Sequence, residues 1–200
     1  MGPAGIGKSS TLAIVEELDS DFGRTGSIVT RQPEARDDPR FIRYVNLAES
    51  LQCIQKHTFV NYVIHPTTNI IYSTALDMFS SRYNMLEALP ESIAYFWNVG
   101  FKKVYVFYLA TEPPAWQKWF DERYPNRRSI ERKKRLAEAE TSLNWALVDH
   151  SYAVTHVYNS PGGQHETAQK IIDSVKYNKK ADTKGRKYVR AMLQQIEEMK

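Results

Sequence analysis

Residues 1–10 read MGPAGIGKSS, and residues 2–9 follow the pattern Gly, four residues, Gly-Lys-Ser. Gly2, Gly5 and Gly7 allow the main chain to adopt positive φ and to approach an anion closely. The N–H groups of such a loop converge on a phosphate at the start of a helix, where the helix dipole adds favourable potential. The pattern therefore predicts a phosphate-binding loop that leads into a helix.

The side chains at the end of this loop have the chemistry that a nucleoside triphosphate needs. Lys8 is expected to neutralise phosphate charge, Ser9 to give its hydroxyl oxygen to Mg²⁺, and Ser10 to assist at the α-phosphate. The predicted nucleotide contacts are Gly2, Gly5, Ile6, Gly7, Lys8, Ser9 and Ser10. A glycine-rich terminus that binds nothing is the alternative, and the helical spacing of the apolar residues that follow argues against it.

The composition favours one globular domain with an anionic ligand. The chain has 200 residues, 42% of them apolar, with a formal net charge of +4 and a pI near 9.0. This charge suits a phosphorylated metabolite and is too small to indicate nucleic acid. Cys53 is the single cysteine, so no disulfide can form within the chain, and no signal-like or membrane-length apolar run is present. These features predict a cytoplasmic protein, either a monomer or a homodimer.

Beyond the loop, strand-like and helix-like patterns alternate. The predicted elements are a helix from Lys8, a strand at 27–30, a mobile charged loop at 31–46, a hairpin of 59–64 and 69–72 on a sheet edge, a short helix at 75–81, a strand at 84–89, a helix at 91–97, a strand at 103–109, a helical stretch at 115–147 broken at 124–126, a strand at 153–158 and a helix at 165–177. The continuously apolar strand at 103–109 belongs inside a parallel sheet. This alternation predicts an α/β fold.

Phosphate loops of this type normally follow a buried central strand, but only Met1 precedes this one. We expect a short apolar strand to belong upstream of Met1, so that the first strand is missing from the sequence. The polar residues 179–200 show a weak helical repeat and are predicted to be a basic C-terminal appendage, with a place in the core as the alternative.

Five stretches resemble, in order and spacing, motifs of the guanylate kinases and related nucleoside monophosphate kinases. They are GPAGIGKSS at 2–10, SIVTRQP at 27–33, NIIYST at 69–74, ERKKRLAEAE at 131–140 and HVYN at 156–159. The resemblance covers residues 2–178. It implies a three-layer P-loop kinase domain over 1–178 with a parallel sheet, an antiparallel acceptor-binding insert at 31–74 and a helical lid at 121–136.

The resemblance also implies roles for single residues. Arg31 is expected to bind the acceptor phosphate, and Arg36 to replace a family arginine whose position holds Glu34. The other residues expected to bind the acceptor are Tyr72, Thr74 and Glu87. Asn159 is expected to contact adenine. The lid arginines are Arg123, Arg127, Arg128, Arg132 and Arg135, and of these Arg127 and Arg135 are predicted to act in catalysis together with Lys8.

Two departures from the family concern the acceptor. Asn61 stands where the family has the glutamate that recognises guanine, and Ile42 stands where it has a phosphate-binding tyrosine. The resemblance implies transfer of a phosphoryl group from ATP, with Mg²⁺, to a nucleoside monophosphate, first of all GMP to GDP. The alternatives are a different acceptor, either another nucleotide or a sugar phosphate, and a non-catalytic interaction module.

Overall fold

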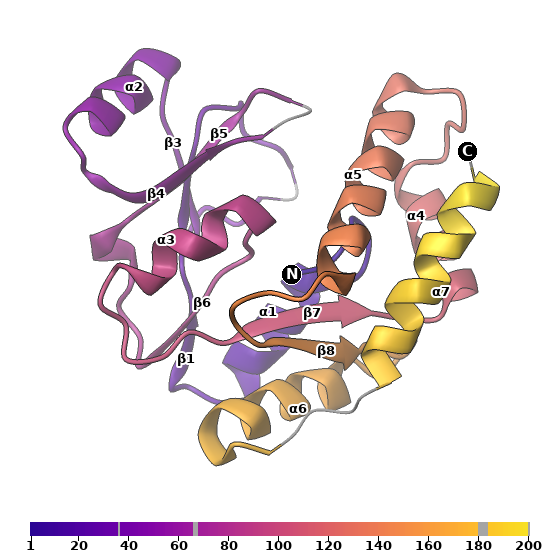
Figure 1. Ribbon diagram of the computed structural model, residues 1–200. Coiled ribbons are helices and arrows are strands. Elements are labelled where there is room, and N and C mark those ends of the chain that lie inside the picture. Colours follow the sequence, from indigo (N-terminus) through magenta and orange to yellow (C-terminus); the bar gives the residue numbers. More distant parts are fainter. Residues whose placement is uncertain (36, 66–67, 180–183, 200) are drawn as a thin grey trace. The chain divides into compact units, whose positions relative to one another are not determined.

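The computed structural model describes residues 1–35, 37–65, 68–179 and 184–199 (Figure 1). The chain forms two compact units. Unit 1 consists of Met1–Asp19 and Tyr105–Lys200, and unit 2 consists of Ser20–Val104. The described part of the chain contains no helix long and apolar enough to span a bilayer.

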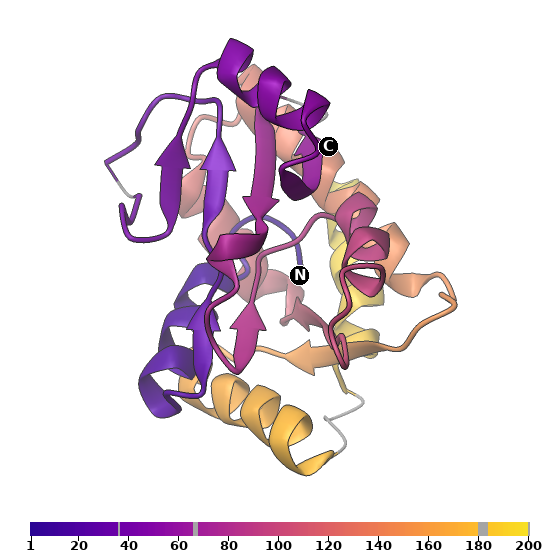
Figure 2. The same cartoon turned by 90° about the vertical axis from the view of Figure 1, so that its left-hand side faces the viewer.

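Unit 1 is a pair of parallel strands between layers of helices. In chain order its elements are α1 (Lys8–Leu18), β7 (Val106–Ala110), α4 (Pro113–Arg123), α5 (Ile130–Leu147), β8 (Val154–Tyr158), α6 (Gln164–Tyr177) and α7 (Lys184–Met199). Strand β7 pairs with β8 from Val106 opposite Val154 to Ala110 opposite Tyr158. Helices α1 and α6 pack together, as do α5 and α7, and Figures 1 and 2 show these two pairs on opposite sides of the strands.

The predicted central strand is confirmed as β7. Tyr108 and Ala110 are fully buried and Leu109 is nearly so, because helices cover both faces of the strand. Met1 lies along its other edge: the terminal ammonium donates to the main-chain oxygen of Phe107 at 2.6 Å, and the N–H of Leu109 donates to the oxygen of Met1 at 2.9 Å. This is the bonding pattern of a parallel bridge. The phosphate loop therefore starts beside the carboxyl-terminal half of β7.

The prediction of a C-terminal appendage is wrong for α7. Val189, Met192 and Ile196 of this helix are fully buried, and the helix contacts α5, β7 and β8. Each such side chain stabilises the folded state by about 1.5–3 kcal/mol. Gly185 lets the first turn come close, since a Cβ there would lie 2.6 Å from the carbonyl carbon of His156. The helix belongs to the core of unit 1.

Unit 2 contains a four-stranded mixed sheet. Its elements are β1 (Phe22–Arg24), β2 (Ser27–Val29), β3 (Ile42–Tyr44), α2 (Leu47–Gln55), β4 (Phe59–Ile64), β5 (Ile71–Ala75), the 3-10 turn η1 (Leu76–Met78), β6 (Tyr83–Met85), the 3-10 turn η2 (Pro90–Ser92) and α3 (Ile93–Trp97). The strand order is β3-β2-β5-β4, in which β2 is parallel to β3 and antiparallel to β5. A separate parallel pair joins β1 and β6.

The predicted hairpin is confirmed as β4 and β5, with β4 at the edge of the sheet. The predictions nearby need correction. The stretch 31–46 includes strand β3, the strand predicted at 84–89 ends at Met85, and the helix predicted at 75–81 is the single turn η1.

Helix α2 was not predicted, although it carries a local start signal. The Asn46 side chain caps it by accepting a hydrogen bond from the N–H of Glu49 at 2.8 Å. An asparagine followed three residues later by a glutamate is a recognisable helix start. The pattern could have located this helix from the sequence.

Candidate functional site

The loop before α1 has the backbone geometry of an anion cradle. Gly2, Gly5 and Gly7 adopt φ of 139°, 79° and 87°, which side chains rarely tolerate. At Gly2 a Cβ would also lie 2.9 Å from the main-chain oxygen of Leu109. The turn therefore requires all three glycines, and the close approach to β7 also requires Gly2.

Two buried side chains tie down the carbonyl groups of this loop. The indole N–H of Trp116 donates to the oxygen of Ala4 at 2.9 Å, and the amide of Asn159 donates to the oxygen of Ile6 at 2.9 Å. In a planar trans peptide, the N–H of the next residue points the opposite way from the carbonyl. The N–H groups of Gly5 and Gly7 therefore face away from Trp116 and Asn159. This orientation suits an anion bound on the side of the loop opposite Trp116 and Asn159.

The structure shows a supporting role for Asn159, whose contact with adenine stays a prediction. Its side chain is fully buried, where its amide holds Ile6 and its oxygen accepts a bond from the Thr167 hydroxyl at 3.0 Å. A side chain so enclosed supports the loop from behind. Trp116, the other side chain that holds the loop, is completely buried beside Phe120.

The polar side chains of the loop lie at the start of α1. Ser9 and Ser10 are exposed in its first turn, and the Ile6 side chain is buried beneath the loop. The Lys8 ammonium donates to the oxygens of Gly2 and Pro3, each at 3.0 Å, and so folds over the loop. These groups fit the phosphates of a nucleotide: N–H donors and a cation for the oxygens, and a hydroxyl for Mg²⁺.

No group of three or more His, Cys, Asp or Glu side chains that could hold a metal ion occurs among the described residues. Mg²⁺ at a phosphate-transfer site takes most of its ligands from water and from the substrate phosphates. A single hydroxyl such as that of Ser9 is therefore a reasonable protein ligand.

In unit 2, strand register brings the predicted acceptor residues to one face of the sheet. Tyr72 pairs with Val29, and Asn61 pairs with Thr74. Paired residues share a face, as do residues two apart on one strand. Tyr72, Thr74 and Asn61 therefore lie on the same face. Arg31 comes two residues after Val29, which continues this row beyond the end of β2.

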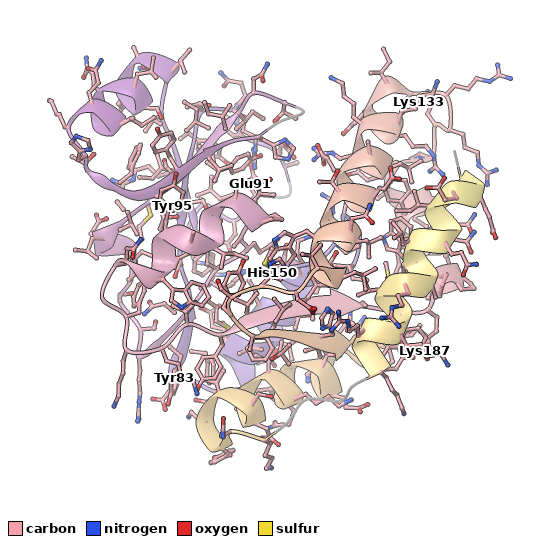
Figure 3. All side chains as sticks on the ribbon, viewed as in Figure 1. Tyr83, Glu91, Tyr95, Lys133, His150 and Lys187 are labelled. Atoms are coloured by element: carbon pink, nitrogen blue, oxygen red, sulfur yellow. The ribbon has the colours of Figure 1, made fainter. Side chains whose placement is uncertain are left out.

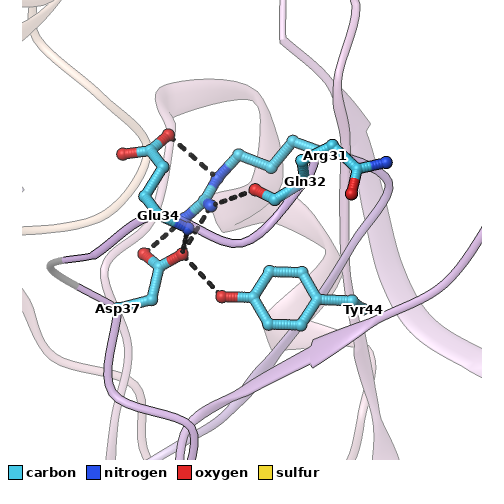
Figure 4. Close-up of polar contacts among 5 residues, drawn as sticks. All are labelled: Arg31, Gln32, Glu34, Asp37 and Tyr44. Atoms are coloured by element: carbon cyan, nitrogen blue, oxygen red, sulfur yellow. Dashed lines mark hydrogen bonds and ion pairs between the residues drawn. The ribbon is translucent and has the colours of Figure 1, made fainter.

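Arg31 is the centre of a dense polar network (Figure 4). Its two terminal nitrogens donate to the two carboxylate oxygens of Asp37, each at 2.6 Å. The same carboxylate accepts the Tyr44 hydroxyl at 2.5 Å and the N–H of Glu34 at 2.7 Å. The loop that was predicted to be mobile thus contains a partly buried ion pair, in which the side chains of Arg31 and Asp37 are 14% and 8% exposed.

The network shifts the pKa values of both partners. The bond to Asp37 raises the pKa of Arg31, although burial opposes this shift. The Arg31 guanidinium holds the pKa of the Asp37 carboxyl well below its usual range, and the Tyr44 hydroxyl adds to the effect. Both groups are therefore charged throughout the physiological range.

A β-bulge aims Asn61 at the face that carries Tyr72. The register between β4 and β5 shifts between Phe59 and Asn61, so that Asn61 stands opposite Thr74. Asn61 is 7% exposed, and its side-chain oxygen is buried without a hydrogen-bond partner among the described residues. A buried acceptor of this kind is costly unless a ligand or water satisfies it.

The predicted lid spans the end of α4, a turn and the start of α5. Arg132 is 95% buried by side chain, donates to the oxygen of Tyr124 at 2.8 Å and pairs with Asp121 at 2.6 Å. It therefore holds the turn together. Arg127, by contrast, is 76% exposed, and its contact with Asp121 is long, at 3.5 Å.

Arg135 is the other lid arginine predicted to act in catalysis. It bonds Glu138 at 2.9 Å, and its Nε is buried without a hydrogen-bond partner in the described part of the chain. Burial lowers its pKa, but the bond to Glu138 and the nearby negative charges, first of all that of Glu138, together outweigh this effect and raise it. Of the residues predicted to bind the acceptor, Glu87 is exposed just beyond β6. Arg36 lies outside the described residues.

Comparisons with known proteins agree with this fold. No protein-family model and no curated protein matches the sequence. Among solved structures, a guanylate kinase from Anaplasma phagocytophilum is similar, with a TM-score of 0.54 and 15% sequence identity over 92% of this chain and 89% of that chain. At this identity the likeness shows the fold alone. The chain thus has a mixed α/β fold like that of a guanylate kinase.

Proposed function

We propose that this chain is a P-loop kinase that transfers the γ-phosphoryl group of ATP to a nucleoside monophosphate, with GMP as the first acceptor to test. The observation that carries the proposal is the loop at residues 2–9. Its carbonyl groups are tied to Trp116 and Asn159, and its N–H groups face the opposite way. The guanylate-kinase-like fold supports the same function.

Each unit carries one half of the proposed chemistry. In unit 1, the loop N–H groups and Lys8 would hold the phosphates of ATP, while Ser9 would hold Mg²⁺, which bridges the phosphates and withdraws charge from them. In unit 2, Arg31 and Tyr72 would hold the acceptor, assisted by Thr74. The proposed acceptor contacts of Glu87 and Arg36 remain predictions.

Catalysis in this proposal is mostly electrostatic. Phosphoryl transfer demands little covalent chemistry from the protein, so cations that meet the oxygens of the transferred group provide most of the acceleration. Arg127 and Arg135 are the proposed lid cations. The exposure of Arg127 and the unpartnered Nε of Arg135 suit such a role better than the buried Arg132.

The experiment is to incubate the full chain with Mg-ATP and a panel of nucleoside and sugar monophosphates, and to measure ADP release and the phosphorylated product. Turnover with one acceptor supports the kinase. Lys8→Ala should reduce the rate at least about a hundredfold, because the loop loses its cation. Lys187→Ala is the matched control, since Lys187 is exposed on α7 (Figure 3). An equal rate in both variants would trace the activity to a contaminant.

A second candidate acceptor follows from Asn61. A carboxylate only accepts hydrogen bonds, whereas an amide offers an acceptor beside a donor. That pair complements adenine or cytosine, whose edges carry an amino group beside a ring nitrogen acceptor, better than guanine with its adjacent N–H donors. If AMP or CMP is the better substrate, Asn61→Glu should move the preference toward GMP by about tenfold or more. Binding of Mg-ATP without turnover on any acceptor would favour the non-catalytic module.

A further inference from the structure

Three different donors meet at the carboxylate of Asp37 (Figure 4). The Arg31 guanidinium contributes two N–H groups at 2.6 Å, the Tyr44 hydroxyl one O–H at 2.5 Å, and the main chain of Glu34 one N–H at 2.7 Å. Proteins bind phosphate oxygens with this same combination of a guanidinium fork, hydroxyls and main-chain N–H groups. The donors form a cradle for an oxyanion, and Asp37 fills it.

Arg31 has further contacts besides its two bonds to Asp37. One terminal nitrogen also donates to the oxygen of Gln32 at 2.9 Å, and the Nε lies 3.5 Å from a carboxylate oxygen of Glu34. A phosphate that binds both terminal nitrogens of Arg31 must take the place of the Asp37 carboxylate. The two anions are mutually exclusive at this position.

We propose that Asp37 is an internal ligand that occupies the acceptor-phosphate position at Arg31 and Tyr44, and that an acceptor binds by displacing it. The proposal rests on the proposed function in identifying the ligand as the phosphate of a nucleoside monophosphate. It makes Asp37 a determinant of selectivity. A phosphate with two negative charges and three acceptor oxygens can compete with a carboxylate, whereas a nucleoside without phosphate gains nothing from the cradle.

A different role for Asp37 would be to orient Arg31 for catalysis. The geometry favours the ligand role because the carboxylate lies at the common focus of three donors from separate positions in the chain. A group that only oriented the guanidinium would have no need of the Tyr44 hydroxyl. The two roles predict opposite effects when the charge of Asp37 is removed.

The test is a calorimetric titration of the full chain with inorganic phosphate, with GMP and with guanosine. Asp37→Asn should bind inorganic phosphate and GMP at least about tenfold more tightly than the unsubstituted chain, with guanosine binding unchanged. Asp38→Asn is the matched control, because Asp38 is the next residue but bonds Arg40 outside the cradle. Adding Arg31→Ala to Asp37→Asn should abolish the gain, which separates this site from any phosphate held by the loop of unit 1.

Several results would overturn the inference. Phosphate binding that is unchanged or weaker in Asp37→Asn would show that Asp37 orients Arg31. If both Asp37→Asn and Asp37→Ser failed to fold by circular dichroism, the carboxylate would be a structural part of the loop. Absence of turnover on every acceptor refutes only the proposed function, since the gain in phosphate binding is measured without ATP.

Discussion

The side-chain amide of Asn159, at the end of β8, donates a hydrogen bond to the main-chain oxygen of Ile6, 153 residues earlier in the chain. Its oxygen accepts the Thr167 hydroxyl at the start of α6. One fully buried amide thus links the phosphate loop to a strand and to a helix of unit 1. The position and orientation of the loop therefore depend on a residue that is buried behind it.

Removing this amide should harm both stability and nucleotide binding. Asn159→Ala leaves the oxygen of Ile6 buried without its donor, which should lower the free energy of unfolding by about 1–3 kcal/mol. Mg-ATP binding should weaken as well, because the N–H groups of the loop lose their fixed direction. Denaturant unfolding and calorimetry measure the two effects. Asn144→Ala, at an exposed position of α5, is the control that should change neither.

Substitutions of Arg132 and Arg127 should have different effects, the first on stability and the second on phosphoryl transfer. Arg132→Met removes the close partner of Asp121 and the donor to the oxygen of Tyr124, so it should lower the free energy of unfolding by about 2–3 kcal/mol. Arg127→Met should change stability by less than about 0.5 kcal/mol, because its pair is exposed. Phosphoryl transfer, if present, should fall in the Arg127 variant while substrate binding by calorimetry changes little. Equal stability losses in both variants would contradict this division.

The start of α7 should tolerate no side chain at Gly185. A Cβ there would lie 2.6 Å from the carbonyl carbon of His156, so Gly185→Ala forces the helix away from β8. The overpacking should cost about 1–3 kcal/mol of stability, although alanine favours a helix by itself. Thermal unfolding measures the loss, with Lys187→Ala on the exposed side of the same helix as the control. A more stable Gly185→Ala variant would show that α7 does not dock on β8.

Acid should destabilise unit 1 through His156. Burial lowers the pKa of this histidine below its usual 6.5, and its Nε2 lies 2.8 Å from the main-chain oxygen of Ala146. The unfolded chain therefore takes up a proton more readily than the folded chain. The contribution to stability is complete above the unfolded pKa and is lost as pH falls through the folded pKa.

The measurement compares thermal unfolding of the full chain at about pH 7.5 and about pH 5.5. The unfolding temperature should be lower at the acidic value, and His156→Gln should reduce the difference because glutamine carries no titrating group. An acid shift of equal size in that variant would assign the effect to other residues.

Helices, strands and turns could be predicted from the sequence where the pattern that specifies them spans only a few residues. The glycine spacing of the loop, the apolar run of β7 and the interruption at Tyr124 depend on backbone conformation and burial within a few residues, and all three predicted features appear in the structure. Helix α2 has a local signal as well, the capping residue Asn46. The three-residue strands β1 and β3 have too few residues for any periodicity to show.

The hydrogen-bond and ion-pair partners of the charged and polar side chains could not be predicted from the sequence. Nothing near Arg31 in the sequence distinguishes Asp37 from Glu34 or Asp38 as its carboxylate, and only the fold of the loop selects one of them. The resemblance of HVYN to a family motif predicts that Asn159 contacts adenine, but it carries no sign of the contact that the structure shows. The partner of Asn159, Ile6, is far away in sequence, so that contact exists only after the chain folds.

The sequence by itself determined that residues 2–9 form a glycine-rich turn, since glycine adopts the positive φ of Gly5 and Gly7 without steric cost. Tertiary structure alone decided which way that turn faces, which acid fills the cradle around Arg31, and that α7 is buried. The physical reason is the distance along the chain over which each effect acts. Backbone preference acts within a few bonds, whereas burial and hydrogen-bond partners depend on residues that only folding brings together.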